Sequence, residues 1–296
     1  MNNFTITAFA DEIAGDLDLQ IKGLKENGIS HIEVRGINGT NVSELTVDQA
    51  AMYKTILHEN GIKVSSIGSP IGKITIEEPF EAHLALFKHV LDLAVIFESP
   101  FVRMFSFFIP EGKEADAYHE AVVARWRQFL AIAADYPQIT LLHENEKDIY
   151  GDTPERCLKL LTELNSPQVK AAFDPANFVQ CDVAVYPHAY ELLKEYIGYM
   201  HIKDARFADH KVTPAGLGDG KVALVLTALV SAGFEGFASL EPHLSIFDGF
   251  ADLEKEGTSI AAAEGDSDKS DGEKLFTVAS EALKKILVET MGQEWK

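Results

Sequence analysis

The stretch ITLLHENEKDIYGDTPERCLKLLTELNSPQVKAAFDPAN, residues 139–177, contains a complete strand–helix–strand unit. Its two ends, Ile139–Glu144 and Val169–Asp174, are short apolar runs of the length typical of buried strands. Between them the tripeptide TPE at 153–155 is a typical helix start, because a threonine hydroxyl can cap the first turn and proline is favoured there. The apolar periodicity that follows predicts a helix over Pro154–Leu164.

The same alternation extends over nearly the whole chain and indicates the fold class. Further strands are predicted at Thr5–Ala10, His31–Ile37, Lys63–Ser69, Phe101–Phe108, Tyr199–Lys203 and Phe237–His243. Further helices are predicted at Leu17–Asn27, Val47–Asn60, Pro79–Phe97, Asp116–Ala134, Tyr186–Tyr196, Val222–Ala232 and Glu273–Glu289. Eight strands, each followed by a helix, predict an α/β fold, a closed (β/α)8 TIM barrel that forms one domain over residues 1–296. A doubly wound open sheet is the alternative, which the count of eight disfavours.

Two segments depart from this alternation. Ser245–Gly272 separates the eighth strand from the last helix, and its end, GTSIAAAEGDSDKSDG, is small, polar and acidic, which predicts a flexible insertion over about 245–272. The loop GLGDGKV, Gly216–Val222, is rich in glycine but lacks the Lys-Ser/Thr step of a phosphate-binding loop. Nucleotide binding is therefore rejected.

Composition narrows the class of protein. Lys and Arg number 26 against 46 Asp and Glu, a net charge of −20, which argues against nucleic acid or a membrane surface as the main partner. The sequence shows neither a membrane-spanning apolar run nor a secretory signal, and two cysteines cannot build a disulfide framework. We therefore expect a cytoplasmic protein that acts on a small molecule. A local group of basic residues could still bind a phosphorylated sugar.

The predicted strands five to eight end in chemically reactive side chains. Their ends read LLHENE, AAFDPAN, YMHIKD and SLEPH, which places Glu144, Asp174, His201 and Glu241 at four successive strand ends. In barrels of this kind the active site lies at this end of the strands. One such acid would commonly cap the next helix, but three carboxylates and one imidazole together suit a divalent ion such as Mn²⁺, Mg²⁺, Co²⁺ or Zn²⁺.

Neighbouring residues are candidates for substrate binding. Alternate residues of a strand share a face, so the residues two positions after Glu144, His201 and Glu241 are expected in the same pocket. His143 has the wrong parity for the barrel interior unless the strand end breaks the alternation. The two cations after the seventh strand either bind a hydroxyl-rich or phosphorylated tail or form ion pairs in the loop. The candidates are Glu146, Asn177, Lys203, Arg206, His143 and His243.

The motifs HEN, FDPAN, HIKD, GLGDG and SLEPH resemble those of the xylose isomerase-like TIM-barrel superfamily, the sugar phosphate isomerases and epimerases, and the resemblance extends from FADEI near the N-terminus to SLEPH. In ketose 3-epimerases of that group, a Glu, an Asp, a His and a Glu from strands five to eight hold one divalent ion. The resemblance implies that Glu144 and Glu241 exchange protons with the substrate carbon from opposite faces. Barrels of this family often form dimers or tetramers, which implies a homo-oligomer. The implied ligands of one metal ion, with Mn²⁺ as the first expectation, are Glu144, Asp174, His201 and Glu241.

Some positions differ from the family pattern or allow two interpretations. Glu146 stands where many relatives carry His, and Asn177 stands where the epimerases have a substrate-binding His. These departures put any role carried over to the two positions in doubt. Glu33 and Arg35 share a face of the second strand and resemble the Glu-x-Arg element of the family, with an internal ion pair as the alternative.

The leading hypothesis is a metal-dependent isomerase or epimerase that acts through an enediolate on a ketose, sugar phosphate or related polyol. The main alternative is a lyase of the same barrel family, either a keto-inositol dehydratase or the catalytic subunit of a C-glycoside deglycosidase. In the deglycosidase, His143 would be an added acid–base and a second subunit would be needed. Endonuclease IV shares the superfamily but needs more histidines and a basic DNA surface, which the net charge of −20 disfavours. A binding protein that has lost turnover is disfavoured by the retained Glu, Asp, His and Glu.

Overall fold

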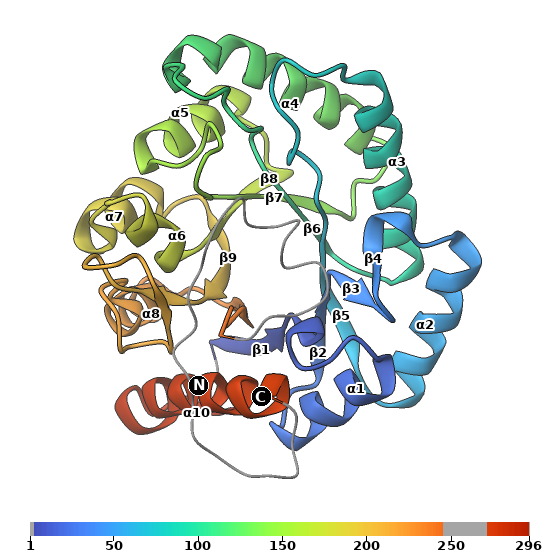
Figure 1. The fold of residues 1–296 in the computed structure, drawn as a ribbon, viewed down its shortest axis with the longest axis vertical. Helices are drawn as coiled ribbons and strands as arrows, with labels where there is room; N and C mark the ends of the chain where they lie inside the picture. Colours follow the sequence, from blue (N-terminus) through green and yellow to red (C-terminus); the bar gives the residue numbers. More distant parts are fainter. Residues whose placement is uncertain (1–2, 245–270, 296) are drawn as a thin grey trace.

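A ring of strands stands at the centre of the molecule, and helices surround it on the outside (Figure 1). The structure, a computed structural model, describes residues 3–244 and 271–295. The eight strands of the ring are hydrogen-bonded in the order β1-β12-β9-β8-β7-β6-β5-β2, and every pairing between them is parallel. β1 and β2, at the two ends of this order, pack against each other, so the sheet closes on itself. The predicted (β/α)8 barrel is therefore confirmed.

Each predicted strand has a counterpart in the barrel. The barrel strands are β1 (Phe4–Ala8), β2 (His31–Val34), β5 (Lys63–Gly68), β6 (Phe101–Met104), β7 (Thr140–Glu144), β8 (Val169–Phe173), β9 (Ile197–Ile202) and β12 (Gly236–Leu240). Two short hairpins accompany them, which pair β3 (Gly36–Ile37) with β4 (Thr40–Asn41) and β10 (Asp204–Ala205) with β11 (Val212–Thr213). The strand predicted over 101–108 ends at Met104, and Phe107 beyond it has a φ of 69°, outside the extended region.

The helices follow the strands in the predicted order. They are α1 (Leu17–Glu26), α2 (Val47–Glu59), α3 (Glu81–Ile96), α4 (His119–Ala133), α5 (Pro154–Leu164), α6 (Pro175–Gln180), α7 (Tyr190–Leu193), α8 (Val222–Ser231) and α10 (Asp271–Lys284). Short helical turns are η1 (Ala10–Glu12), η2 (Val42–Glu44), η3 (Ala115–Tyr118), η4 (Val185–Ala189) and η5 (Lys285–Thr290). Thr153 caps α5 as predicted, because its hydroxyl accepts a hydrogen bond from the Arg156 amide.

Three helical segments differ from the predictions. The helix predicted over 186–196 is reduced to α7, since the preceding residues form the wider turn η4. α6 was not predicted. α10 begins at Asp271, so the last two residues of the predicted insertion 245–272 belong to a helix. The rest of that insertion, residues 245–270, lies outside the described residues.

The inside of the barrel is layered along its axis. Inside the barrel, five of its strands contribute to an apolar layer formed by Phe101, Leu142, Ala172, Tyr199 and Phe237. Two residues further along the same strands, the inward positions carry charged or polar side chains. The apolar layer therefore lies on the N-terminal side of these polar positions, which lie toward the C-terminal mouth of the barrel.

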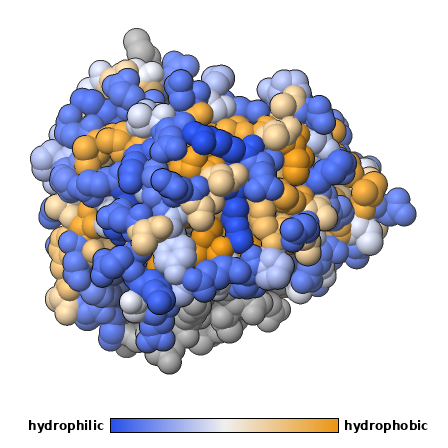
Figure 2. Space-filling view, turned by 90° about the horizontal axis from the view of Figure 1, so that it is seen from above, coloured by the Kyte–Doolittle hydropathy of each residue, from blue (hydrophilic) through white to orange (hydrophobic). Residues whose placement is uncertain are grey.

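Hydrophilic side chains cover most of the face shown in Figure 2, with hydrophobic residues between them singly or in small groups. The larger exposed apolar side chains, such as Leu19, Leu217 and Leu224, belong to different elements. Among the described residues, no helix combines the length and the apolar character needed to cross a membrane.

Candidate metal centre and active site

Four side chains from successive strand ends meet at the C-terminal mouth of the barrel. Glu144 ends β7, Asp174 follows β8, His201 lies in β9 and Glu241 follows β12. Each offers a ligand atom, these atoms all lie within 4.8 Å of one another, and all four residues are buried. The residues predicted as metal ligands are thus brought together in space, and we call them the quartet.

Glu33, on β2, lies beside the ring of His201. Its Oε2 lies 3.3 Å from His201 Nε2. The other ring nitrogen, Nδ1, lies 2.9 Å from Glu144 Oε1 and 3.3 Å from Glu241 Oε2. Burial alone would lower the pKa of His201, but the carboxylates of Glu144, Glu33 and Glu241 raise that pKa well above its ordinary value. Nδ1, which faces Glu144 and Glu241, is the ring nitrogen placed to serve as a ligand atom, and a carboxylate beside the other ring nitrogen recurs at histidines that bind metals.

In each glutamate of the quartet, one carboxylate oxygen accepts a hydrogen bond from an arginine. Arg103 Nη1 donates to Glu144 Oε2 at 3.0 Å, and Arg35 Nη1 donates to Glu241 Oε1 at 3.1 Å. The opposite oxygens, Glu144 Oε1 and Glu241 Oε2, are the ones that face His201. Each glutamate therefore presents one oxygen to the quartet and the other to a guanidinium group.

The guanidinium groups of both arginines lie over the ring of Phe9. The guanidinium carbon of Arg35 lies 4.5 Å from the centroid of the Phe9 ring, and that of Arg103 lies 5.4 Å from it, both within cation–π range. Gly68, at the end of β5, leaves room for this ring, since a Cβ there would lie 2.6 Å from a Phe9 ring carbon. A side chain at position 68 would therefore displace the ring on which both arginines rest.

Arg35 also binds acidic residues outside the quartet. It donates to both oxygens of Asp11, at 2.8 and 3.0 Å, and to Glu12 at 3.1 Å. Burial raises the pKa of Glu12 to about 8, although Arg35 acts in the opposite direction. Glu33 and Arg35 have different partners, namely His201 for Glu33 and Glu241 for Arg35. The Glu-x-Arg element of β2 thus supports two members of the quartet.

Lys203 lies between two carboxylates of the quartet. Its Nζ is 3.1 Å from Asp174 Oδ2 and 3.5 Å from Glu241 Oε2. Burial would lower the pKa of Lys203, but the surrounding carboxylates, led by Asp174, raise it well above its ordinary value. Burial raises the pKa of Asp174 to about 7, with Lys203 opposing the shift. For Glu241, Lys203 and two histidines outweigh burial and hold the pKa well below its ordinary value.

Two asparagines connect the quartet residues of β7 and β8. Asn177 Nδ2 donates to Glu144 Oε1 at 3.3 Å and to the Asn145 carbonyl at 2.9 Å. The side chain of Asn145 donates to the Asp174 carbonyl at 2.8 Å and accepts from the Asp174 amide at 2.9 Å. Asp174 also caps α6, because its Oδ1 accepts from the Asn177 amide at 2.9 Å. Its Oδ2 is then the oxygen that points to the quartet.

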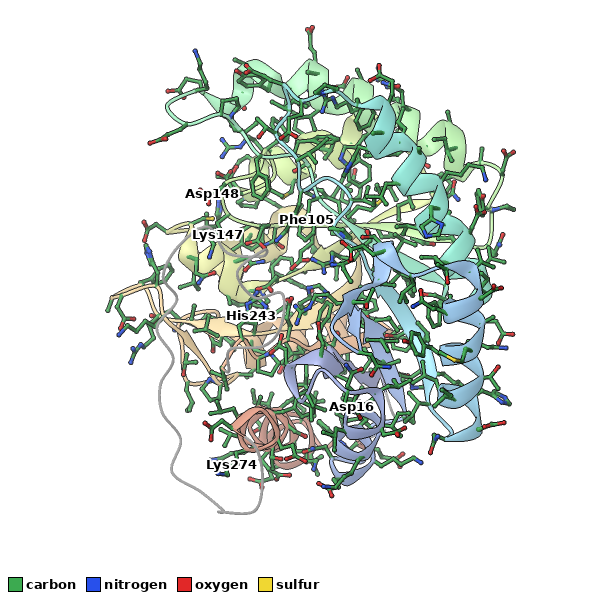
Figure 3. All side chains as sticks on the ribbon, turned by 45° about the vertical axis from the view of Figure 1, so that its right-hand side comes forward. Asp16, Phe105, Lys147, Asp148, His243 and Lys274 are labelled. Carbon is green, nitrogen blue, oxygen red and sulfur yellow. The ribbon has the colours of Figure 1, made fainter. Side chains whose placement is uncertain are left out.

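Four of the predicted substrate-binding residues lie beside the quartet. Asn177 and Lys203 contact it as described above. Glu146 follows Glu144 on the inward side, with its Oε2 3.3 Å from Lys73 Nζ. His243 Nε2 lies 3.3 Å from Glu241 Oε1, and Figure 3 shows His243 inside the ring of strands.

The other two predicted residues lie away from the quartet. His143 faces out of the barrel, where its ring meets Trp126 edge-on with 5.6 Å between centroids. Burial lowers the pKa of His143 to about 3, and neither ring nitrogen has a hydrogen-bond partner in the part of the chain that the structure describes. Arg206 is exposed, and its Nη2 lies 2.6 Å from Asp209 Oδ2.

The glycine-rich loop after β11 encloses a carboxylate of the chain itself. Asp204 accepts hydrogen bonds from the amides of Gly216, Gly218 and Gly220 at 2.9, 3.0 and 2.8 Å. A Cβ at Gly218 would collide with the Asp204 side chain. The amides of this loop are thus occupied by Asp204, and the glycines are needed for that close approach.

Sequence reasoning left Glu33 and Arg35 open between a family element and an internal ion pair, counted Arg103 only as a weaker candidate, and assigned none of the three to the site. Their signal is periodicity: they occupy inward positions of β2 and β6 or of the residues just after β2. A charged side chain at a buried strand position needs a partner of opposite charge. Each of the three could therefore have been assigned to the site.

Proteins of known structure share this fold at low sequence identity. A D-allulose 3-epimerase from Methylomonas sp. matches with a TM-score of 0.74 and 17% identity, covering 97% of this chain and 99% of that chain. The probable 3-DHS dehydratase AsbF from Bacillus anthracis matches with a TM-score of 0.71 and 16% identity, covering 96% and 99%. The IolI protein with a binding zinc atom matches with a TM-score of 0.72 and 15% identity, covering 97% and 99%. At these identities the likeness establishes the fold alone.

The family assignment rests on the sequence. Comparison with curated protein sequences finds no match. A family model, described as xylose isomerase-like TIM barrel, matches residues 21–262, which include the whole quartet. With most of its length matched by this model, the protein belongs to the xylose isomerase-like TIM barrel family.

Proposed function

We propose that the protein is a divalent-metal-dependent isomerase or epimerase that moves a proton at the carbon next to the carbonyl of a ketose or related polyol. The observation that carries the proposal is the buried quartet, three carboxylates and one imidazole nitrogen within 4.8 Å of one another. This donor set fits a divalent ion of the Mn²⁺, Co²⁺ or Zn²⁺ type. When bound, the ion would polarise the substrate carbonyl and so acidify the neighbouring C–H bond.

The two glutamates are the proposed acid–base pair. Glu144 and Glu241 enter the site from β7 and from the end of β12, which are not neighbours in the barrel. They can therefore reach the substrate carbon from different sides. One removes the proton and the other returns a proton to the opposite face, which gives epimerisation; return at the adjacent carbon gives isomerisation. The arginine on the far oxygen of each glutamate fixes how that carboxylate is turned.

The charges in the site favour an uncharged substrate over a sugar phosphate. Among the residues that the structure describes, each lysine and arginine buried around the quartet has a carboxylate partner. These partners are Asp11, Glu12 and Glu241 for Arg35, Glu144 for Arg103, Glu146 for Lys73, and Asp174 and Glu241 for Lys203. A phosphate would have to compete with these carboxylates. Hydroxyl groups can instead share the same polar side chains without displacing an ion pair.

A lyase remains the second candidate function, because removal of the same proton also starts an elimination. The dehydratase and the epimerase that share this fold differ in the product, as their names indicate. The position of His143 opposes the deglycosidase alternative. That reaction needs His143 at the substrate, whereas the ring faces Trp126 outside the barrel.

Solvent exchange tests the proposed reaction. The protein, supplied with Mn²⁺, is incubated in deuterated water with uncharged ketohexoses, including D-allulose, and with keto-inositols. We expect one deuteron at the carbon next to the carbonyl, detected by NMR, with loss of exchange in Glu241→Gln and retention in the exposed Glu120→Gln. A new double bond with loss of water would support the dehydratase instead. Conversion of a ketose without any exchange would contradict both.

A further inference from the structure

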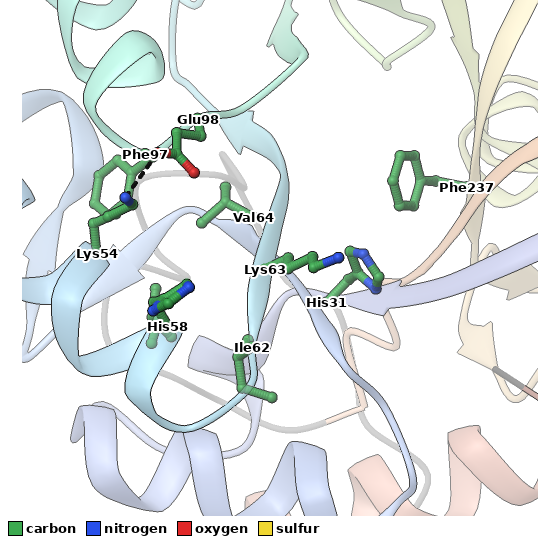
Figure 4. A pocket seen from close by; sticks show the side chains of 10 residues that line it. His31, Lys54, His58, Ile62, Lys63, Val64, Phe97, Glu98 and Phe237 are labelled. Carbon is green, nitrogen blue, oxygen red and sulfur yellow. Dashed lines mark hydrogen bonds and ion pairs between the residues drawn. The ribbon is translucent and has the colours of Figure 1, made fainter.

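A pocket at the N-terminal mouth of the barrel has a charge opposite to that of the whole chain. It has a volume of about 260 Å³ and lies between the last turns of α2, the end of α3 and the first residues of β2 and β5 (Figure 4). The basic side chains that line it are His31, Lys54, His58 and Lys63, against the single acidic residue Glu98 among the lining residues that the structure describes. In a chain with a net charge of −20, this is a local reversal of sign.

Lys63 and His31 lie side by side in this pocket, and Lys63 has no carboxylate partner among the described residues. They are register partners at the start of β5 and β2, and Figure 4 shows the Lys63 ammonium directed toward the imidazole. Throughout residues 3–244 and 271–295, no carboxylate forms an ion pair with Lys63. Burial and the charge of Lys63 together lower the pKa of His31. The imidazole is therefore neutral at pH 7, so Lys63 would supply the positive charge and His31 a hydrogen-bond donor to an anion between the two groups.

The opposite wall of the pocket is already neutralised. Lys54 Nζ lies 2.8 Å from Glu98 Oε1, and the Glu98 side chain is 72% exposed. This ion pair therefore leaves Lys63 and His31 as the place for an anionic group. Ser30 Oγ lies 3.1 Å from His31 Nδ1, so Nε2 is the ring nitrogen left to face a ligand.

Apolar side chains form the rest of the pocket. Leu57, Ile62 and Phe97 are buried in its wall, and Phe237 meets the His31 ring edge-on with 5.4 Å between centroids. Phe237 is also part of the apolar layer that fills the barrel, together with Tyr199 at 5.7 Å. That layer stands between this pocket and the quartet, so a ligand bound here does not reach the active site.

We propose that this pocket binds a small organic anion, one carboxylate or phosphate group on a compact apolar body. Lys63 and His31 would hold the anionic group, and the apolar body would lie against Phe237 and Phe97. The volume of about 260 Å³ is slightly below the usual range for small-molecule sites, which favours a single ring over a nucleotide.

Calorimetric titration with simple probes tests the proposal. The probes are phenyl phosphate and benzoate as organic anions, phenol as an uncharged ring, and inorganic phosphate as a bare anion, all at constant ionic strength. We expect saturable binding of the two organic anions and a dissociation constant that rises about tenfold or more in Lys63→Met. Lys63 is exposed at a strand start, so this variant should fold, which is checked by its melting temperature.

The matched control is Lys113→Met, which removes the same charge from an exposed loop position. It should bind both probes as the wild type does. Equal binding by wild type and Lys63→Met, or no binding of either organic anion by the wild type, would overturn the proposal. The proposal would also be overturned if phenol or inorganic phosphate bound as tightly as phenyl phosphate. Binding would then not require both an anionic group and an apolar ring in the ligand.

Discussion

The carboxylate of Glu33 lies 3.3 Å from Nε2 of His201, while Nδ1 of the same ring faces Glu144 and Glu241. Nδ1 is therefore the ring nitrogen that faces the carboxylates of the quartet, and Nε2 is the one beside Glu33. Glu33 lies on β2, far in sequence from the strand ends that carry the four residues of the quartet. We therefore expect the affinity of the quartet for an ion to depend on Glu33, which is not one of the four proposed ligands.

Glu33→Gln should lower the affinity for Mn²⁺ about 10- to 100-fold, because the amide keeps the shape of the side chain but removes the negative charge beside His201 Nε2. Competition with a fluorescent chelator measures this affinity directly. The exposed Glu120→Gln serves as the control for loss of one negative charge. An unchanged affinity in Glu33→Gln would show that the contact does not orient the ligand.

Arg103→Met should lower kcat about 100-fold or more while about one ion per chain is retained, because the variant removes the donor on Glu144 Oε2 but leaves Oε1 facing the quartet. Loss of the buried partner should also reduce the free energy of unfolding by about 3 kcal/mol. Arg103→Lys should recover part of kcat, since lysine restores a donor but not the guanidinium geometry. Steady-state kinetics and metal analysis on both variants test this. A wild-type kcat in a folded Arg103→Met would exclude the positioning role.

Asp204→Ala should loosen the glycine-rich loop. The amides of Gly216, Gly218 and Gly220 lose their common acceptor, which should cost about 3 kcal/mol of unfolding free energy. Hydrogen exchange of these amides should become faster. Asp209→Ala, which removes an acid from the neighbouring exposed hairpin, should leave their protection unchanged. Retained protection in Asp204→Ala would contradict the view that this carboxylate shapes the loop.

His83 should make stability depend on pH. Its Nε2 accepts a hydrogen bond from the Gly72 amide at 2.8 Å, and burial, aided by Arg125, lowers its pKa from 6.5 to about 4. Between these values the unfolded chain binds a proton that the folded chain does not, so the free energy of unfolding falls as the pH falls through this range. Denaturant titrations at both ends of the range should show a smaller drop for His83→Gln. An equal drop in both proteins would contradict this assignment.

The fold and the quartet could be predicted because both follow from local patterns. Strand and helix alternation indicates the barrel, and the barrel places strand ends such as those at Glu144 and Glu241 together. The arginine contacts could not be predicted, because Arg103 and Glu144 are 41 residues apart and their meeting depends on the register of the sheet. His143 was left open by the sequence, and the regular alternation of β7 turns it outward.

α6 shows a signal that the sequence analysis overlooked. Asp174 followed by Pro175 is the same kind of helix start as Thr153 followed by Pro154, which was used to predict α5. Helix capping by a strand-end acid such as Asp174 was considered only as the alternative to metal binding. In the structure, Asp174 Oδ1 accepts a hydrogen bond from the first turn of α6, while Oδ2 points toward the other residues of the quartet and Lys203.

The metal content of the purified protein, measured by elemental analysis after incubation with Mn²⁺ and removal of free ion, tests the central claim most directly. The wild type is compared with a variant that carries Glu241→Gln and His201→Ala. We expect about one divalent ion per chain in the wild type and loss of that ion in the variant. No bound ion in the wild type, or the same content in both proteins, would mean that the quartet does not hold a metal and would contradict the proposed reaction.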